Sequence, residues 1–520
     1  MRKAKRAKVD RAAAPPARQA ATSYDEVPYE SFPFAQTHPD HLATLAHLLG
    51  LSPPAVERCS VLELGCAGGG NLLPMAVALP QAKFVGIDLS GVQIAHGQKV
   101  VDALGLANVR LLATDLRQIG KGFGRFDYII AHGVYSWVPN AVQDAILEIC
   151  RRNLTANGVA YVSYNTLPGW HMRGMVRDLM RFQAAGFDTA TKRVEQARAI
   201  LDFLAQSIPE HGNPYGALLR NELKLLRPAP DYYILHEHLA ETNEPLYFHQ
   251  FAERAAGHGL QYLAEADFAT MFASGFSPQV AETLRRVAPH LIRQEQLMDF
   301  LRYRMFRQTL LVSAECSVER TIVPDRLHGL WVASPVRPQR AEPDLGPEAP
   351  EGFVTPAGRT LTTSQPLTKA AFWILSGTWP QYLPFSDLLE KAQARVAARS
   401  QGAPAPDAVQ TLGTDLLNGF TIHAVELHAA AAPFTSMLSQ KPTASPLARY
   451  QATQGPDVTN LRHALLRLGE PQLSLLRLLD GTRDRAALRP GVASAMPGSV
   501  SPDALEKHLR ELAQSALLMA

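Results

Sequence analysis

Residues 61–71 read Val-Leu-Glu-Leu-Gly-Cys-Ala-Gly-Gly-Gly-Asn, and this stretch decides the fold of the chain. An apolar strand carries the acid Glu63 and then opens into a loop that has almost no side chains. Such a loop lets the backbone approach a ligand closely and directs its amide N–H groups at it. A second apolar run, residues 84–87, ends in Asp88, which follows Gly65 at about the distance where a ribose-binding acid belongs. The pattern therefore predicts a site for a nucleoside-containing ligand.

The region around this stretch alternates between strand-like and helix-like segments, which is the pattern of a parallel sheet with crossover helices. Most of the strand candidates are rich in Val, Ile, Leu, Ala and Tyr, as strands covered on both faces should be. The predicted strands are residues 60–64, 83–88, 109–113, 126–131 and 158–164. The predicted helices are residues 71–79, 91–104 and 140–153, with Gly105 at the end of the second.

Composition places the chain among ordinary globular proteins. It has 520 residues, of which 46% are hydrophobic and 19% are charged, and this length suggests about three domains. No apolar run approaches the roughly 20 residues that a membrane span requires, so we expect no span and a cytoplasmic location. Four cysteines are scattered without the spacing of metal ligands, which favours reduced thiols.

The charge is unevenly distributed. Residues 1–20 contain seven basic side chains and one acid, whereas the whole chain has a net charge of +3. The remainder is therefore slightly acidic, which argues against a nucleic-acid partner for the body of the protein. We expect residues 1–22 to form a disordered basic tail, with contact to a nucleic acid or an anionic surface as the alternative.

The second half of the chain reads mainly as helices. Residues 172–320 have helical periodicity, apart from a late strand candidate at residues 259–263, and the Pro-rich stretch 335–350 resembles a linker or long loop. The sequence Leu-Ser-Gly-Thr at residues 375–378 and Leu-Asp-Gly-Thr at residues 479–482 each precede helical segments. Either two related helical modules of winged-helix type follow one another, or the match is due to chance.

Three details favour S-adenosyl-L-methionine over a nicotinamide dinucleotide as the ligand. Glu63 would repel a pyrophosphate but suits a ligand with an ammonium and a sulfonium. Asp115 ends the third strand, where a carboxylate can accept the adenine amino group. A fourth strand, residues 126–130, then leads into a loop at the methionine end, so three acids lie along one edge of an open sheet.

These residues resemble the class I S-adenosylmethionine-dependent methyltransferases, with residues 62–69 as the first motif. That family usually has glycine where Ala67 stands. A closer resemblance is to bacterial methyltransferases with a methyltransferase regulatory domain, including the rickettsial protein lysine methyltransferases. The stretches that carry it are residues 24–29 (YDEVPY), 36–39 (QTHP), 132–139 (HGVYSWVP), 163–171 (SYNTLPGWH), 244–248 (EPLYF) and 259–265 (GLQYLAE).

The resemblance implies an α/β, Rossmann-like sheet of order 3-2-1-4-5-7-6, whose seventh strand is antiparallel and whose last two strands follow a helical insertion. It also implies a homodimer and, in the best-described relatives, methylation of a lysine in an outer-membrane protein. The domains we expect are the tail (1–22), a cofactor-binding core with an N-terminal lid (23–171), a helical insertion with the regulatory domain (172–320) and two mainly helical C-terminal modules (321–445 and 446–520).

The expected cofactor site combines the glycine loop, the strand-end acids and the lid, residues 29–39. The residues that we expect to bind the cofactor are Glu63, Gly65, Ala67, Gly69, Asp88, Asp115, Leu116, His132, Gln36 and His38. We predict no metal site, since no cluster has the required spacing. His236 and His238 would share one face of a strand, but no third ligand accompanies them.

Methyl transfer requires the protein to align the reacting atoms and to exclude water. A lysine has a pKa near 10.4 in water, and an aromatic pocket would lower that pKa by desolvation and favour the neutral amine. Residues after the fourth and fifth strands lie at the same edge as the cofactor. The catalytic or acceptor-pocket candidates are Tyr135, Tyr164, Asn165 and His171; His38 or His171 could also act as a base, although solvent can take the proton.

The sequence therefore predicts an S-adenosylmethionine-dependent methyltransferase that acts on a protein lysine. Two alternatives remain open at this point. The acceptor could be a small molecule enclosed by the helical insertion, or the chain could be a regulatory protein that binds the cofactor without transferring its methyl group.

Overall fold

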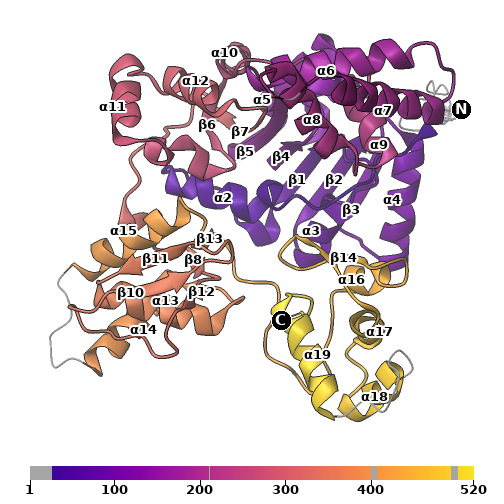
Figure 1. Ribbon diagram of the computed structural model, residues 1–520. Helices are drawn as coiled ribbons and strands as arrows, with labels where there is room; N and C mark the ends of the chain where they lie inside the picture. Colours follow the sequence, from indigo (N-terminus) through magenta and orange to yellow (C-terminus); the bar gives the residue numbers. More distant parts are fainter. Residues whose placement is uncertain (1–25, 210, 400–406, 494–501, 520) are drawn as a thin grey trace, which may run out of the picture.

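A seven-stranded sheet lies at the centre of the structure, which is a computed structural model (Figure 1). The structure describes residues 26–209, 211–399, 407–493 and 502–519, so the predicted basic tail lies outside the described residues. The strand order is β3-β2-β1-β4-β5-β7-β6. β7 runs antiparallel to both β5 and β6, and the predicted sheet is confirmed. The strands are β1 (Ser60–Leu64), β2 (Lys83–Asp88), β3 (Val109–Ala113), β4 (Phe126–Ala131), β5 (Leu154–Asn165), β6 (Leu260–Glu265) and β7 (Phe306–Ser313).

The crossover helices follow the local sequence signals. They are α3 (Leu72–Ala78), α4 (Gly91–Leu104) and α5 (Asn140–Asn153). Ser90 caps α4 by accepting a hydrogen bond from Gln93 N, and Gly105 ends the helix at φ 63°. β5 begins earlier than predicted, because Leu154 pairs with Phe126 before a shift of register in the ladder between β4 and β5.

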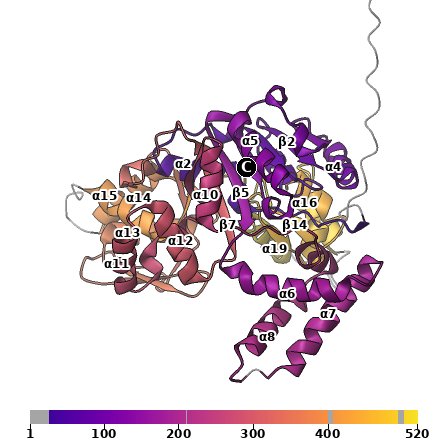
Figure 2. The ribbon, with the colours of Figure 1, turned by 90° about the horizontal axis from the view of Figure 1, so that it is seen from above.

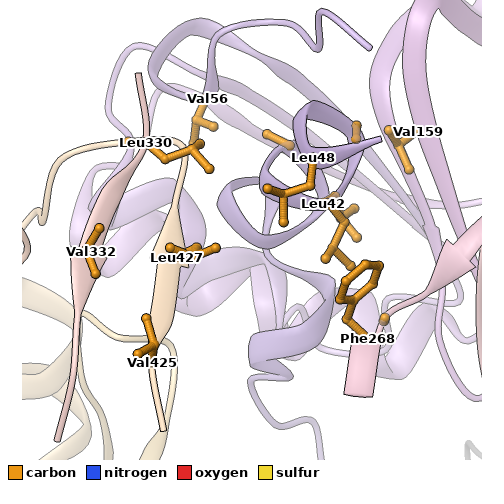
Figure 3. Packing of buried hydrophobic residues seen from close by; sticks show 14 of the residues in the cluster. Leu42, Leu48, Val56, Val159, Phe268, Leu330, Val332, Val425 and Leu427 are labelled. Carbon is orange, nitrogen blue, oxygen red and sulfur yellow. The ribbon is translucent and has the colours of Figure 1, made fainter. Parts of the chain in front are cut away.

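The N-terminal segment packs one helix between the sheet and the C-terminal half. This helix, α2 (Pro39–Leu48), follows the short 3₁₀ turn η1 (Ala35–Thr37). Its apolar side chains belong to one hydrophobic cluster that is continuous from the sheet to the strands around residues 330 and 427. Figure 3 shows this packing around Leu42, Leu48, Val56, Val159, Phe268, Leu330, Val332, Val425 and Leu427.

A helical insertion stands between β5 and β6. Its first part, α6 (Gly169–Ala184), α7 (Ala190–Ser207) and α8 (Pro214–Leu226), extends away from the sheet in Figure 2. This part has its own hydrophobic cluster. Its two ends meet where Thr166 forms a bridge with Leu246, and Leu167 N donates to Leu246 O at 3.1 Å. The insertion continues with α9 (Asp231–Tyr233) and α10 (Phe248–Gly257), and two further helices, α11 (Pro278–Val287) and α12 (Leu291–Arg302), lie between β6 and β7.

The expectation that His236 and His238 lie on a strand is wrong. Both belong to a π-helical turn, residues Ile234–His238, that continues directly from α9. His236 Nε2 lies 2.7 Å from Val27 O and so joins this turn to the N-terminal segment. His236 therefore fixes the insertion against the N-terminal part of the chain.

The first C-terminal module, residues 321–445, contains two small three-stranded sheets as well as helices, so it is less helical than expected. The stretch 335–350 is part of its core rather than a linker, because Val336 and Leu345 are buried in the large hydrophobic cluster. The elements are β8 (Trp331–Ala333), β9 (Arg337–Pro338), β10 (Glu351–Val354), β11 (Thr360–Thr363), α13 (Pro366–Thr378), β12 (Leu383–Pro384), α14 (Phe385–Ala397), α15 (Ala408–Phe420) and β13 (Glu426–His428).

The second C-terminal module, residues 446–520, packs its first helix against α3 and α4 of the catalytic sheet. It also contains a short two-stranded hairpin. The elements are α16 (Pro446–Gln451), β14 (Asp457–Thr459), β15 (Leu465–Arg467), α17 (Glu470–Leu478), α18 (Arg485–Ala493) and α19 (Pro502–Gln514).

A buried ion network joins α2 to both C-terminal modules. Asp40 accepts hydrogen bonds from the backbone N–H groups of Ala429 and Ala430 at 2.7 and 3.0 Å, and its carboxylate lies 2.7 Å from His428 Nδ1. Glu426 contacts His428 and pairs with Arg462 of the second module. Burial opposes the charged imidazole, but Asp40 and Glu426 outweigh it and raise the pKa of His428 to about 9.

The network predicts a loss of stability at alkaline pH. The pKa of His428 is raised above the ordinary value of 6.5, so its stabilising contribution is complete below that value and is lost as pH rises through about 9. We expect the apparent unfolding temperature of the wild type to fall more between pH 6.5 and pH 9.5 than that of His428→Gln. Parallel curves for the two proteins would contradict a charged His428 in the folded state.

Candidate active site

The glycine loop after β1 turns through three residues with left-handed backbone. Gly65, Ala67 and Gly69 have φ values of 75°, 47° and 78°. Asp88 holds the middle of this loop, because its Oδ2 accepts from Ala67 N at 2.8 Å while its Oδ1 accepts from Ser90 N at 2.8 Å. The predicted ribose acid therefore stands at the end of β2, directly against the loop.

Glu63 is buried at the end of β1, with 4% of its surface exposed. Its Oε1 accepts a hydrogen bond from Asn71 Nδ2 at 2.7 Å, and its Oε2 has no hydrogen-bond partner among the described residues. Burial raises the pKa of Glu63 to about 8; the bond from Asn71 lowers it, and the charge of Asp88 adds to the rise. An unpartnered buried carboxylate oxygen fits the ammonium group of an amino-acid ligand.

Asp115 and Leu116 lie after β3, at the same edge of the sheet. The Asp115 carboxylate accepts from Arg117 N at 2.9 Å and from Arg117 Nη2 at 2.6 Å. The side-chain hydrogen bond from Arg117 lowers the pKa of Asp115, so the group is anionic at neutral pH. Leu116 is half-buried against a second hydrophobic cluster, which lies between the sheet and α5 and includes Ile129 and Ile146. Asp115 thus has a structural partner, and its bond to adenine stays a prediction.

The N-terminal segment lies over the glycine loop, as a lid would. Gly70 N donates to Ser31 Oγ at 2.7 Å. A Cβ atom at Gly70 would stand 2.1 Å from the Ser31 carbonyl oxygen, so the close approach of the two segments requires glycine there. Phe34 N donates to Asn71 Oδ1 at 2.9 Å, and the Phe34 ring lies over His132 with centroids 4.0 Å apart.

His132 occupies the end of β4 beneath this segment. Its Nδ1 lies 2.9 Å from the Tyr161 hydroxyl, to which Gln36 also forms a hydrogen bond. Burial lowers the pKa of His132 to about 4, which leaves the imidazole neutral. The structure therefore brings together two of the predicted site residues, His132 and Gln36, around Tyr161, a residue that the sequence did not single out.

His38 lies one turn further along the same segment. Its Nδ1 accepts from Asp40 N at 3.2 Å and so caps α2. Burial lowers the pKa of His38 to about 4, with Asp40 opposing that change, and its ring lies 5.3 Å from the ring of His463. A neutral imidazole that caps a helix is poorly placed to serve as a base in its own right.

Tyr135 and Tyr164 are fully buried. Tyr164 stacks on Phe251 of α10 with centroids 4.1 Å apart, and its hydroxyl lies 3.2 Å from Thr309 Oγ1. Tyr135 packs edge-on against the same phenylalanine at 5.3 Å. Both tyrosines belong to the second hydrophobic cluster. This position favours a packing role, and their catalytic role stays a prediction.

Asn165 and His171 lie where β5 passes into the insertion. Asn165 is 4% exposed, and its Nδ2 donates to Asn243 Oδ1 at 2.9 Å. His171 is exposed in the first turn of α6, with Nε2 3.0 Å from the Tyr247 hydroxyl. The structure therefore separates the four catalytic candidates into two buried core residues and two residues at the base of the insertion.

The sequence interpretation missed Asn71 and His463. Asn71 occupies the N-cap position of α3 but makes no cap, because its side chain turns toward Glu63. The sequence could have indicated Asn71, because this polar residue directly follows the glycine loop. It could not have indicated His463, which lies 392 positions away from its partner Asn71.

The described residues contain neither a cluster of metal-ligand side chains nor a helix that could span a membrane. Within residues 26–519, outside the gaps given above, no group of three or more His, Cys, Asp or Glu side chains could hold a metal ion. In the same part of the chain, no helix has the length and apolar character needed to cross a lipid bilayer.

The left-handed backbone of Ala67 should lower the stability of the protein, because a Cβ atom disfavours this conformation. We expect Ala67→Gly to raise the free energy of unfolding by about 0.5–1 kcal/mol. The control is Ala95→Gly on the exposed face of α4, which should lower the same quantity by about 1 kcal/mol. Denaturant titrations of both variants check the opposite signs; a destabilised Ala67→Gly protein would contradict the loop conformation.

Comparison with known proteins agrees with this geometry. Residues 61–158 match the family model described as methyltransferase domain, residues 230–313 match the predicted methyltransferase regulatory domain, and residues 440–499 match the C-terminal winged helix domain of PKMT. An uncharacterized protein of Rickettsia prowazekii, RP789, is 38% identical over 472 residues, which cover 89% of this chain and 84% of the relative. A second protein of that organism, RP028, is 44% identical over 233 residues, 45% of this chain and 93% of the relative.

A solved structure extends the likeness to the whole chain. PKMT2 from Rickettsia typhi, also solved in complex with AdoHcy (S-adenosylhomocysteine), is 30% identical with a TM-score of 0.83. The match covers 95% of this chain and 100% of PKMT2. The predicted cofactor, S-adenosylmethionine, and the predicted winged-helix domain at the C-terminus are thereby confirmed. The chain belongs to the family of class I S-adenosylmethionine-dependent methyltransferases that includes the rickettsial PKMTs.

Proposed function

We propose that this methyltransferase transfers a methyl group to a lysine amine of a protein substrate. The observation that carries the proposal is the extent of the likeness to PKMT2, which spans both chains almost completely. A likeness confined to residues 61–158 would support only a shared cofactor. The insertion and the C-terminal modules lie outside that region, so agreement there supports a shared class of acceptor.

The strand-end acids hold the cofactor in this proposal. Glu63 binds the ammonium group through its unpartnered Oε2, and Asp88 accepts hydrogen bonds from the ribose. Once bound, S-adenosylmethionine supplies an electrophilic methyl group on a sulfonium centre.

The acceptor amine approaches beside His132. A lysine amine is mostly protonated in water at neutral pH, and apolar surroundings such as the Phe34 ring lower its pKa and favour the reactive form. With Nδ1–H of His132 donating to the Tyr161 oxygen, Nε2 carries a lone pair that can orient the amine N–H. Because the imidazole is a weak base here, the amine proton leaves to solvent before the lid segment excludes water.

Glu63 gives a test of the cofactor contacts that does not need the acceptor. At pH 7 the free protein holds Glu63 mostly protonated, since its pKa is about 8. Pairing with an ammonium ionises it, so S-adenosylhomocysteine binding should release close to one proton per site. Calorimetric titration in two buffers of different ionisation enthalpy measures that number. Glu63→Gln keeps the acceptor for Asn71 and should release none from this site, with about tenfold or greater loss of affinity.

Equal proton release by the wild type and Glu63→Gln would contradict the assignment of Glu63 to the ammonium. Thermal unfolding of both proteins serves as the control, since a misfolded variant would also lose affinity.

The acceptor class is tested with tritiated S-adenosylmethionine and bacterial extracts that include the cell envelope. We expect label in the macromolecular fraction and methylated lysine after its acid hydrolysis. Asp88→Ala is the background control, because it removes a cofactor contact and leaves the acceptor side of the site unchanged. If label appears only in small molecules, the proposal is wrong and the acceptor is a small molecule. Absence of label, with S-adenosylhomocysteine still bound, would indicate a non-catalytic protein.

A further inference from the structure

Asn71 connects three distant parts of the chain through one side chain. Its Oδ1 accepts from Phe34 N at 2.9 Å and lies 2.8 Å from His463 Nε2. Its Nδ2 donates to Glu63 Oε1 at 2.7 Å and to Thr37 Oγ1 at 3.0 Å. A primary amide has two acceptor lone pairs and two N–H groups, so all four positions are used.

These bonds determine which atoms carry hydrogen. The backbone N–H of Phe34 can only donate, which identifies its partner on Asn71 as the oxygen and turns the NH₂ group toward Glu63. His463 Nε2 faces the same oxygen and must therefore be the protonated nitrogen. Burial and the neighbouring His38 hold the pKa of His463 far below its ordinary value, so the ring stays neutral in this tautomer.

His463 lies in a turn that is held in place by hydrogen bonds and an ion pair of its neighbouring residues. It connects β14 to β15, and Asn460 Oδ1 accepts from Arg462 N and Ala464 N at 3.1 and 2.9 Å. Arg462 pairs with Glu426 and lies over the Trp379 ring at 4.4 Å. His463 itself is 4% exposed and has left-handed backbone at φ 59°. Few non-glycine residues adopt that conformation, so the surroundings impose it.

We propose that His463 is a positioning residue of the cofactor site, which holds the Asn71 amide and through it the Glu63 carboxylate at the place of the ligand's ammonium group. The C-terminal winged-helix domain thereby takes part in cofactor binding. The inference rests on the proposed contact between Glu63 and the ammonium group, and it does not depend on the acceptor proposed above.

The test compares two ligands on the full-length protein. S-adenosylhomocysteine has the amino-acid end that Glu63 binds, and 5′-methylthioadenosine lacks it. His463→Phe keeps a planar ring of similar size without a donor, and His463→Gln keeps an N–H group at the end of a side chain of similar reach. We expect His463→Phe to raise the Kd of S-adenosylhomocysteine about tenfold. The same variant should leave the Kd of 5′-methylthioadenosine within about twofold of the wild-type value. We expect His463→Gln to restore the wild-type Kd of S-adenosylhomocysteine.

Further variants keep the test decisive if the Phe protein folds poorly. His463→Asn tolerates left-handed backbone but is too short to reach Asn71, so it should behave like His463→Phe. Arg467→Ala, on an exposed position of the same hairpin, should change neither Kd. Equal weakening of both ligands by the His463 variants would reduce the residue to a structural role. Unchanged binding of both would overturn the proposal.

Discussion

Glu63 is a carboxyl group held at the end of a buried strand, and the arrangement of the active site depends on how that group is satisfied. An ionised carboxylate costs several kcal/mol to bury unless charges and donors surround it. The protein offers one donor, Asn71, and a second acid, Asp88, close enough to raise the pKa of Glu63 further. The site is thus electrostatically incomplete until a cation enters it. In the proposed function, the affinity for the ammonium end of the cofactor follows from this incompleteness.

The parts that surround Glu63 come from the whole length of the chain. The N-terminal segment lies over the glycine loop, where Ser31 accepts a hydrogen bond from Gly70 N. The winged-helix hairpin contacts Asn71, the partner of Glu63, through His463. The buried network around Asp40 fixes α2 to the first C-terminal module. Since α2 belongs to a hydrophobic cluster shared by the sheet and that module, the protein is an integrated structure rather than a catalytic domain with independent appendages.

Local signals in the sequence predicted the catalytic sheet well. β1 to β4 were expected within their observed bounds, because each is an apolar run that ends in a turn residue. β5 was expected to start too late, at residue 158, since Asn157 resembles a turn residue, whereas the strand begins at Leu154 and a register shift against β4 separates Leu154 from Val159. The π-helical turn at His236 was unpredictable from alternation, because two histidines separated by one residue are typical of a strand face.

The candidate site shows a different limit of sequence reasoning. The acids at strand ends were found because topology alone places them at one edge. Tyr135 after β4 and Tyr164 near the end of β5 could not be assigned in the same way, since a residue at a strand end can turn inward to the core or outward to the ligand. Phe251, from an element more than 80 residues downstream, makes the inward position favourable. His463 depends on tertiary packing of the most distant module.

The junction at Thr166 and Leu246 brings the two ends of the insertion together. Residues 167–245 leave the sheet after Thr166 and return to it at Leu246, and α6 to α8 share a small hydrophobic core. Changes in the length of such a closed excursion alter its closure entropy only slowly and need not move β5 or β7. The segment can therefore change in length as one closed unit while the cofactor-binding edge of the sheet keeps its geometry.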